Sequence, residues 1–361
     1  MKLVLEKRSE HSELMTLMSP VLAIILTVIT GAIIFAVQGL NPFSALFVYF
    51  IEPITSLWSF EEVLVKAAPL ILIGAGLSVC YMANVWNIGA EGQLTMGALA
   101  GSFVPIIFSS WQSPLTLVAM LVMGALGGAA FAAIPAFLKN RFNANEILTS
   151  LMLVYIAQLI LDWVVRGPWR DPQGYNFPQS IAFEGWQLLP ILGSGRVHIG
   201  IILAIITVII LTVLMNRTLK GFEILVIGNA PRAGRFAGFS RKKIVWFTLL
   251  LSGGLAGLAG IGEVAGPSGQ LQTAISPGYG FTAIIVAFLG RLNPIGVFFA
   301  GIMLAITYIG GEAAQITLGV SDKTAQVFQG VLLFFILACD TLILYRIKML
   351  GSTKQQPVAA E

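Results

Sequence analysis

The chain consists mainly of long runs of apolar residues that contain no charged side chain. A helix needs about 20 predominantly apolar residues to cross a bilayer, and each run is long enough for one or two such helices. The runs and the glycines and prolines between them predict ten membrane-spanning segments, of which the eighth is short. The predicted segments are 20–40, 63–83, 92–109, 114–138, 146–165, 197–215, 244–265, 280–290, 294–310 and 326–345.

Composition agrees with this pattern. Apolar residues make up 57% of the chain and charged residues 11%, whereas roughly a quarter of the residues in a soluble domain are charged. An outer-membrane barrel would alternate apolar and polar residues in segments of about 10, which this sequence does not do. We therefore expect an all-α membrane protein, a polytopic helical bundle of about ten transmembrane segments in one transmembrane domain, 1–361.

One uncharged stretch does not read as a simple helix. Pro267, Pro277 and several glycines interrupt the sequence between residues 266 and 290. Irregular backbone is tolerated at membrane depth only where it is buried in protein or lines a polar cavity. The stretch 266–290 is therefore predicted to be a broken or re-entrant element.

The basic residues predict an orientation. With the N-terminus inside, most of the 21 lysines and arginines fall in inner segments, as the positive-inside rule requires. Both termini, the N-terminal segment 1–19 and the loop 216–243 are then cytoplasmic, while 166–196 is an extracytoplasmic (periplasmic) loop. The expected location is the bacterial inner (plasma) membrane. Topology also accounts for the net charge of +4, so we expect no nucleic-acid partner.

The two long loops allow different interpretations. The outer loop contains Trp169, Tyr175 and Trp186, which either lie at the membrane interface or form a docking surface for an outer partner. The inner loop is either an ordinary basic loop or carries a short helix. In that helix Asn229 would cap the start, Pro231 would occupy the first turn and Gly238 would end the element. Such a helix is suited to dock into a groove on a soluble partner.

No energy source or catalytic site is visible in the sequence. There is no GxxxxGK[ST] phosphate loop, and Cys80, Cys339, His11 and His198 lack any metal-site spacing. We expect no catalytic residues, no metal and no cofactor bound by this chain. A carrier driven by an ion gradient would need charges in mid-span, yet the acidic candidates lie at or near predicted span ends, where the interface can solvate them. These are Glu91, Glu146, Asp162, Glu263 and Asp340.

The most polar stretch between spans is ANVWNIGAEGQLTMG, which contains Asn87, Glu91 and Gln93. It is either a chain break on a solute route or a tight turn. Tyr155, Tyr279 and Phe281 are further candidates for the route, with helix packing as the alternative. Glycines at spacings of three and four allow close helix packing, so a structural role is expected for the set Gly253, Gly254, Gly257 and Gly260.

Four stretches together resemble the permease family of ATP-binding cassette (ABC) importers that includes ribose-type sugar, branched-chain amino acid and nucleoside systems. They are NVWNIGAEGQLTMGALAG, NANEILTSLMLVYIA, GFEILVIGNAPRAGRFAGFSRKKI and SPGYGFTAIIVAFLGRLNPIG. Within the family, the sequence is most similar to the nucleoside permeases, through the NExxxxLMLxYIA pattern and the N-terminal EKRSEHS element. Val154 stands where the nucleoside group has asparagine.

The resemblance implies an importer subunit that moves nucleosides inward by alternating access. ATP and Mg²⁺ would be used by separate ATPase subunits, and a second permease chain, identical or different, and an outer solute-binding protein would complete the complex. A ribose-type sugar permease is the alternative within the family, and a self-contained ion-driven carrier the alternative outside it. The loop 216–243 would couple to the ATPase through Gly228, Asn229, Pro231, Arg232, Arg235, Phe236, Ala237 and Gly238.

Overall fold

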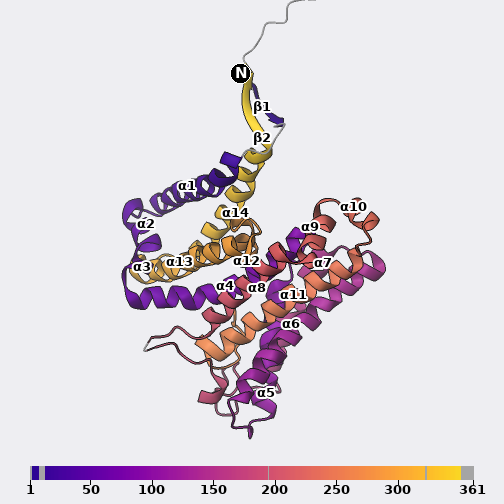
Figure 1. Ribbon diagram of the computed structural model, residues 1–361. Helices are drawn as coiled ribbons and strands as arrows, with labels where there is room; N and C mark the ends of the chain where they lie inside the picture. Colours follow the sequence, from indigo (N-terminus) through magenta and orange to yellow (C-terminus); the bar gives the residue numbers. More distant parts are fainter. Residues whose placement is uncertain (1, 8–12, 194, 322, 351–361) are drawn as a thin grey trace, which may run out of the picture. The chain divides into compact units, whose positions relative to one another are not determined.

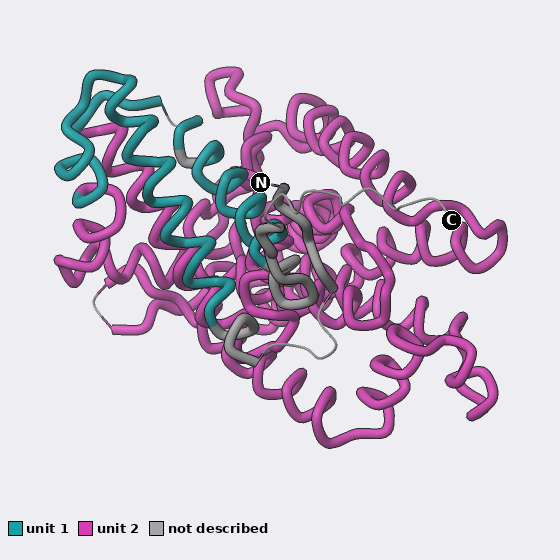
Figure 2. The backbone as a smooth tube through the Cα atoms, turned by 90° about the horizontal axis from the view of Figure 1, so that it is seen from above, with its two compact units in different colours: residues 1–47, 318–361 teal, residues 48–317 magenta. Residues whose placement is uncertain are grey.

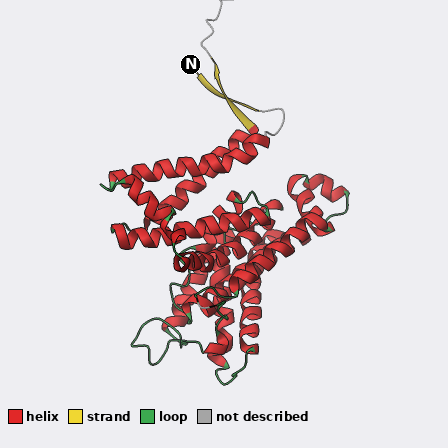
Figure 3. Ribbon diagram, turned by 60° about the vertical axis from the view of Figure 1, so that its left-hand side comes forward, coloured by secondary structure: helices red, strands yellow, loops and turns green. Residues whose placement is uncertain are grey.

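A computed structural model describes residues 2–7, 13–193, 195–321 and 323–350, and most of the described chain is helical (Figure 3). It divides into two compact units. Unit 1 comprises residues 1–47 and 318–361, and unit 2 comprises residues 48–317 (Figure 2). Each unit is considered by itself below.

Unit 1 pairs the two ends of the chain. Helix α1 (Glu13–Val37) packs against α14 (Lys323–Leu344). The Phe328 ring lies over Gly31 and its centroid is 5.4 Å from that of Phe35, so a residue without a side chain lets the two helices approach. Strands β1 (Lys2–Lys7) and β2 (Tyr345–Leu350) form an antiparallel pair, which the all-α expectation did not include.

Unit 2 holds the remaining helices, apart from the first part of α2, and Figure 1 labels the α-helices. They are α2 (Pro42–Phe50, which begins in unit 1), α3 (Glu52–Thr55), α4 (Leu57–Met82), α5 (Ala90–Ile107), α6 (Leu115–Phe142), α7 (Glu146–Arg166), the 3₁₀ turn η1 (Gly185–Gln187), α8 (Gly200–Arg217), α9 (Leu219–Asn229), α10 (Pro231–Phe236), α11 (Arg241–Glu263), the π turn η2 (Val264–Ser268), α12 (Tyr279–Leu289) and α13 (Pro294–Leu318). Helix α4 is central, with 89% of its apolar window buried, whereas only 28% is buried in α6 and α7. The outer helices are therefore apolar on faces that only lipid or another membrane protein can cover.

All ten predicted segments fall on helices, but the count of ten spans is not confirmed. Seven helices in the described part of the chain are long and apolar enough to cross a membrane: α1 from Met18, α4, α6, α7, α8, α11 with η2, and α13. Helix α12 is short, as the sequence predicted. Helix α5 reaches 18 residues, yet Glu91 and Gln93 in its first turns lower its hydropathy. A predominantly helical membrane protein is thus confirmed at the level of class.

Glycines fix the packing of α5, α6 and α11. A Cβ atom on Gly257 would lie 2.9 Å from the Cα of Gly128, and one on Gly260 would lie 2.8 Å from the carbonyl carbon of Leu94. Real Cβ atoms essentially never approach so closely, so these helices pack backbone to backbone. Gly253 is similarly close to α6, whereas a Cβ on Gly254 would meet nothing nearer than 3.6 Å. The expected structural role is confirmed for three of the four glycines.

The break predicted after α11 is present. The π turn η2 contains Pro267, and Gly269 and Gly278 adopt positive φ angles of 66° and 101° before α12 begins. The loop 166–196 provides hydrogen-bond partners for this irregular backbone. Ser180 N donates to Leu271 O at 2.9 Å, and Leu189 N donates to Ala265 O at 2.7 Å. The segments 179–189 and 265–272 therefore form one packed layer.

Candidate solute-pathway and coupling sites

The connection between α4 and α5 is an ordered polar element rather than an open turn. Asn87 is fully buried, and its amide exchanges two hydrogen bonds with the amide of Gln93, at 2.8 and 3.0 Å. Its Nδ2 also donates to Ser252 Oγ on α11 at 3.1 Å, and its Oδ1 accepts from Gly89 N. Every hydrogen-bonding group of the Asn87 amide is thus engaged, which fixes the path of the chain between the two helices.

Glu91 joins the N-termini of two helices. It lies in the first turn of α5, is 4% exposed, and its Oε2 accepts from Gly280 N in the first turn of α12 at 2.6 Å. The Ser276 hydroxyl, which accepts from Tyr279 N at 2.9 Å, also interacts with the Glu91 carboxyl. A carboxylate is favourable here because both helix dipoles direct their positive ends toward it. A side chain at Gly280 would collide with the α5 backbone, so the two helix starts are in direct contact.

A second charged cluster links four helices of unit 2. Lys66 on α4 lies 3.7 Å from Glu312 Oε1 on α13, and its Nζ is 5.9 Å from the centre of the Tyr279 ring. Lys66 also acts electrostatically on Glu263, the last residue of α11, which is 7% exposed. Tyr308 continues the cluster through a 2.7 Å hydrogen bond to Thr282. Glu312 is exposed, but a partly buried lysine, the buried carboxyl of Glu263 and two buried tyrosines inside a membrane bundle are expensive, and such groups commonly mark functional positions.

The acidic residues are more buried than the sequence suggested. Interfacial solvation is wrong for Glu91, Glu146 and Glu263, all 8% exposed or less. Glu146 instead forms an ion pair with Lys139. Asp162 does remain accessible and pairs with Arg166 at 2.7 Å, while the side chain of Asp340 lies outside the described residues. Lys66 lies inside the predicted segment 63–83. A lysine within a membrane span is the sequence signal for this charged cluster, which the prediction missed.

The residues predicted to border the solute route fall into two groups. Asn87, Glu91, Gln93 and Tyr279 come together where α4, α5 and α12 meet, and each is at most 4% exposed. The other two face outward from unit 2, with Tyr155 on α7 58% exposed and Phe281 on α12 41% exposed.

The predicted cytoplasmic helix is present as α10. Pro231 occupies its first turn and Gly238, with φ 83°, follows its end, both as predicted. Phe239 N donates to Gly234 O at 2.9 Å and Gly238 N donates to Arg235 O at 3.1 Å, which closes the helix. Ala230 rather than Asn229 is the N-cap, because Asn229 completes the preceding helix α9.

The surface of α10 combines one large aromatic side chain with two basic ones. Phe236 is 94% exposed, and Arg232 and Arg235 are exposed beside it. Helix α9 holds α10 in place, because Gly234 packs against Ile227. Among the predicted coupling residues Gly228 is the exception: it packs against the Met82 backbone at the end of α4 and is only partly accessible. The segment 216–243 therefore links the exposed helix α10 to the connection between α4 and α5.

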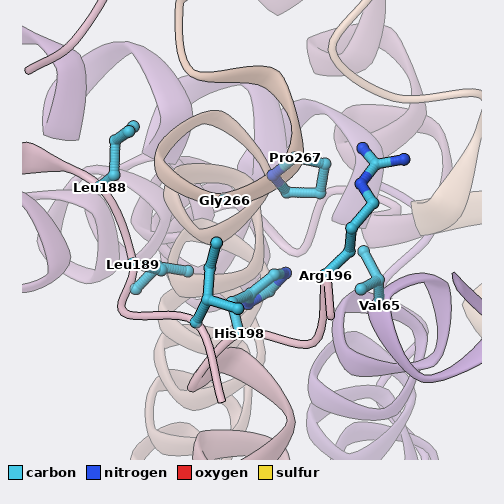
Figure 4. Close-up of a pocket in the computed structure, with 8 residues that line it drawn as sticks. Val65, Leu188, Leu189, Arg196, His198, Gly266 and Pro267 are labelled. Atoms are coloured by element: carbon cyan, nitrogen blue, oxygen red, sulfur yellow. The ribbon is translucent and has the colours of Figure 1, made fainter. Parts of the chain in front are cut away.

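A cavity of about 210 Å³ lies between the segment that precedes α8 and the π turn η2 (Figure 4). His198 lines it together with Arg196, Gly266 and Pro267. The His198 Nδ1 accepts from Gly200 N at 3.1 Å, whereas Nε2 is buried and has no hydrogen-bond partner among the described residues. Burial lowers the pKa of His198 to about 4, so the ring is neutral near pH 7.

Comparison with known proteins identifies the family. The model of the branched-chain amino acid transport system / permease component family matches residues 59–337. The chain belongs to this permease family. It is 36% identical to the glucose ABC transporter permease of Haloferax volcanii, over 91% of this chain and 89% of that protein. No solved structure matches the chain.

Two further relatives are nucleoside permeases. The guanosine ABC transporter permease of Bacillus subtilis is 29% identical over 91% of this permease and 94% of its own length. The nucleoside ABC transporter permease of Lactococcus lactis is 27% identical over 88% of this permease and 89% of its own length. The chain is thus a multi-pass membrane protein of an ABC permease family, whose members are transport components rather than enzymes.

Proposed function

We propose that this permease is the transmembrane subunit of an ABC importer and moves a neutral solute inward by alternating access driven by separate ATPase subunits. The observation that carries the proposal is the family match, which covers both the Glu91 junction and the α9–α10 loop. The sequence adds that the chain has no phosphate loop of its own, which supports a separate ATP-hydrolysing chain as the energy source.

The proposed complex has two permease chains, identical or different, two ATPase subunits that use ATP and Mg²⁺, and an outer solute-binding protein. In this arrangement both termini and the α9–α10 loop are cytoplasmic, and the chain itself binds no cofactor. The segment from η2 to α12 is a re-entrant element, supported by its irregular backbone and by its bonding to the outer loop.

The α9–α10 loop is the proposed contact with the ATPase. Closure of the ATPase subunits on nucleotide would move α10, and the packing of Gly228 on the end of α4 would transmit that movement to the α4–α5 connection. The Asn87 and Glu91 contacts tie this connection to α11 and α12. We therefore propose that Asn87, Glu91, Gln93 and Tyr279 border the solute route. Tyr155 and Phe281 border it only if they face the second permease chain.

Charge reversal at Arg235 tests the coupling contact. Arg235 is exposed and forms no ion pair within the described chain, so Arg235→Glu leaves the fold intact. We expect membrane insertion to be normal, and ATPase association and uptake to be lost. Arg217→Glu, a reversal at the exposed last residue of α8, is the matched control and should retain both activities. Normal uptake by Arg235→Glu would contradict the proposed contact between α10 and the ATPase.

The proposed cargo contains a neutral sugar ring. A nucleoside is the first candidate, supported by the pattern at Asn145–Ala157 and by the names of two relatives. A simple sugar is the second, since the relative that is 36% identical is named as a glucose permease. Uptake of labelled nucleoside, challenged with unlabelled nucleosides, ribose or glucose, separates the two. Competition by the sugars alone would reject the nucleoside.

A further inference from the structure

A basic groove lies where α6 ends and α11 begins. Its volume is about 420 Å³, and Lys139, Arg141, Arg235, Arg241 and Lys242 line it. The groove is held open by fixed backbone: Asn143 ends α6 with a φ of 53°, and Asn140 Nδ2 donates to Lys242 O at 3.2 Å. The cations therefore surround a preformed hollow instead of being spread along a loop.

The positive charge of the groove is not neutralised within the described chain. Glu146 pairs with Lys139, but no described carboxylate pairs with Arg141, Arg235, Arg241 or Lys242. Two of these cations also lie in the first turn of α11, where the helix dipole is already positive and a basic residue is unfavourable. Retention of positive charge inside the cell explains the number of basic residues. It does not explain their convergence on one hollow at a helix end that disfavours them.

An apolar stripe on α6 leads into the groove. Leu115, Val118, Val122, Leu126, Ile134 and Phe137 are all exposed and recur at helical spacing along one side of the helix. Helix α6 has 28 residues, or about 42 Å, and so exceeds the roughly 30 Å hydrocarbon core. Its last turn, which contributes Lys139 and Arg141, therefore reaches headgroup depth, and Phe142 beside it is 67% exposed. A ligand of this surface has an anionic head and an apolar tail.

We propose that the groove binds the phosphate of an anionic phospholipid whose acyl chains lie along α6. Basic pockets between transmembrane helices on the cytoplasmic side are suited to anionic lipid headgroups. Because Arg235 belongs to α10, a bound lipid would also brace that helix against α6 and α11. The inference needs the groove to face the cytoplasmic leaflet, but it does not depend on the cargo or on the ATPase.

Native mass spectrometry of the detergent-purified full chain tests the site. The probes are phosphatidylglycerol, phosphatidylcholine with the same acyl chains, and inorganic phosphate. Each lysine or arginine near an anionic lipid surface contributes about a fivefold affinity. The double variant Arg141→Gln/Lys242→Gln should therefore bind phosphatidylglycerol about 25-fold more weakly than the parent. Circular dichroism of both proteins in phosphatidylcholine verifies that the variant is folded.

The control is Arg217→Gln/Lys243→Gln, which removes the same charge from exposed positions that do not line the groove. It should bind phosphatidylglycerol within about twofold of the parent. Equal loss in the two double variants would overturn the proposal, because general positive charge would then suffice. Equal binding of phosphatidylcholine, or full competition by inorganic phosphate, would also overturn it. So would unchanged lipid binding with weakened ATPase association, which would assign the groove to an acidic protein surface.

Discussion

Replacement of Gly257 by alanine is the sharpest test of how the bundle is packed. Gly257 lies at the crossing of α11 with α6, where a Cβ atom would be 2.9 Å from both the Cα and the N of Gly128 and closer still to the Gly124 carbonyl. Ordinary van der Waals contacts begin near 3.4 Å, and every nearby atom belongs to backbone. The two helices must therefore move apart by about 1 Å to accept one methyl group.

The magnitude follows from two opposing terms. Overpacking of a tight contact typically costs about 1–3 kcal/mol, whereas alanine is favoured over glycine in a helix by up to about 1 kcal/mol. We expect Gly257→Ala to lower the free energy of unfolding by about 1–2 kcal/mol. Gly254→Ala is the matched control, because its Cβ would meet nothing closer than 3.6 Å. That variant should be neutral or more stable by up to about 1 kcal/mol.

The assay is unfolding of the purified chain by titration with a denaturing detergent, followed by tryptophan fluorescence. The difference between the two variants should be about 2 kcal/mol, with Gly257→Ala the less stable. If both alanine variants were equally stable, the backbone contact between α11 and α6 would not be the constraint that the structure indicates.

Four further variants probe the polar elements. Glu91→Leu leaves Gly280 N without its acceptor and should lower the free energy of unfolding by about 2 kcal/mol. Glu91→Gln keeps an acceptor and should lower the free energy of unfolding by less. The same titration measures both variants, and equal stability of the two would contradict the contact between Glu91 and Gly280. Asn87→Ala removes the partner of Gln93 and Ser252 and should cost about 2–4 kcal/mol, which an unchanged unfolding midpoint would exclude. His198 has a folded pKa of about 4 against an ordinary 6.5, so the unfolded chain takes up the proton first and stability falls as the pH drops from 6.5 to 4, by up to about 3 kcal/mol. His198→Gln should flatten this dependence of the thermal midpoint on pH, and identical pH profiles would refute the assignment.

Much of the helical framework was predictable because each helix carries its own signal. Uncharged runs located the segments, and Pro231 and Gly238 marked the start and end of α10 from local backbone chemistry alone. The break after α11 was visible in the same way, through Pro267 and the glycines around it. The number of spans was less predictable, because two polar residues in the first turns of α5 lower its hydropathy without preventing the helix.

The contacts within the site could not be predicted, since they join distant parts of the chain. The bond from Gly280 to Glu91 spans 189 positions, and that from Asn87 to Ser252 spans 165. Sequence spacing says nothing about such pairs. It also placed Glu263 near a span end, where it is the last residue of α11, yet Lys66 and Tyr279 interact with its carboxyl and the side chain is buried instead of solvated.

Transport by the purified permease in liposomes tests the central claim most directly. Labelled nucleoside or glucose would be followed in vesicles that contain the permease chains alone, with a proton or sodium gradient, and in vesicles that also contain the ATPase subunits, the binding protein and ATP. The account predicts solute movement only in the complete system, and its loss when ATP is replaced by a non-hydrolysable analogue. Gradient-driven movement by the permease chains alone would contradict it and would identify a self-contained carrier.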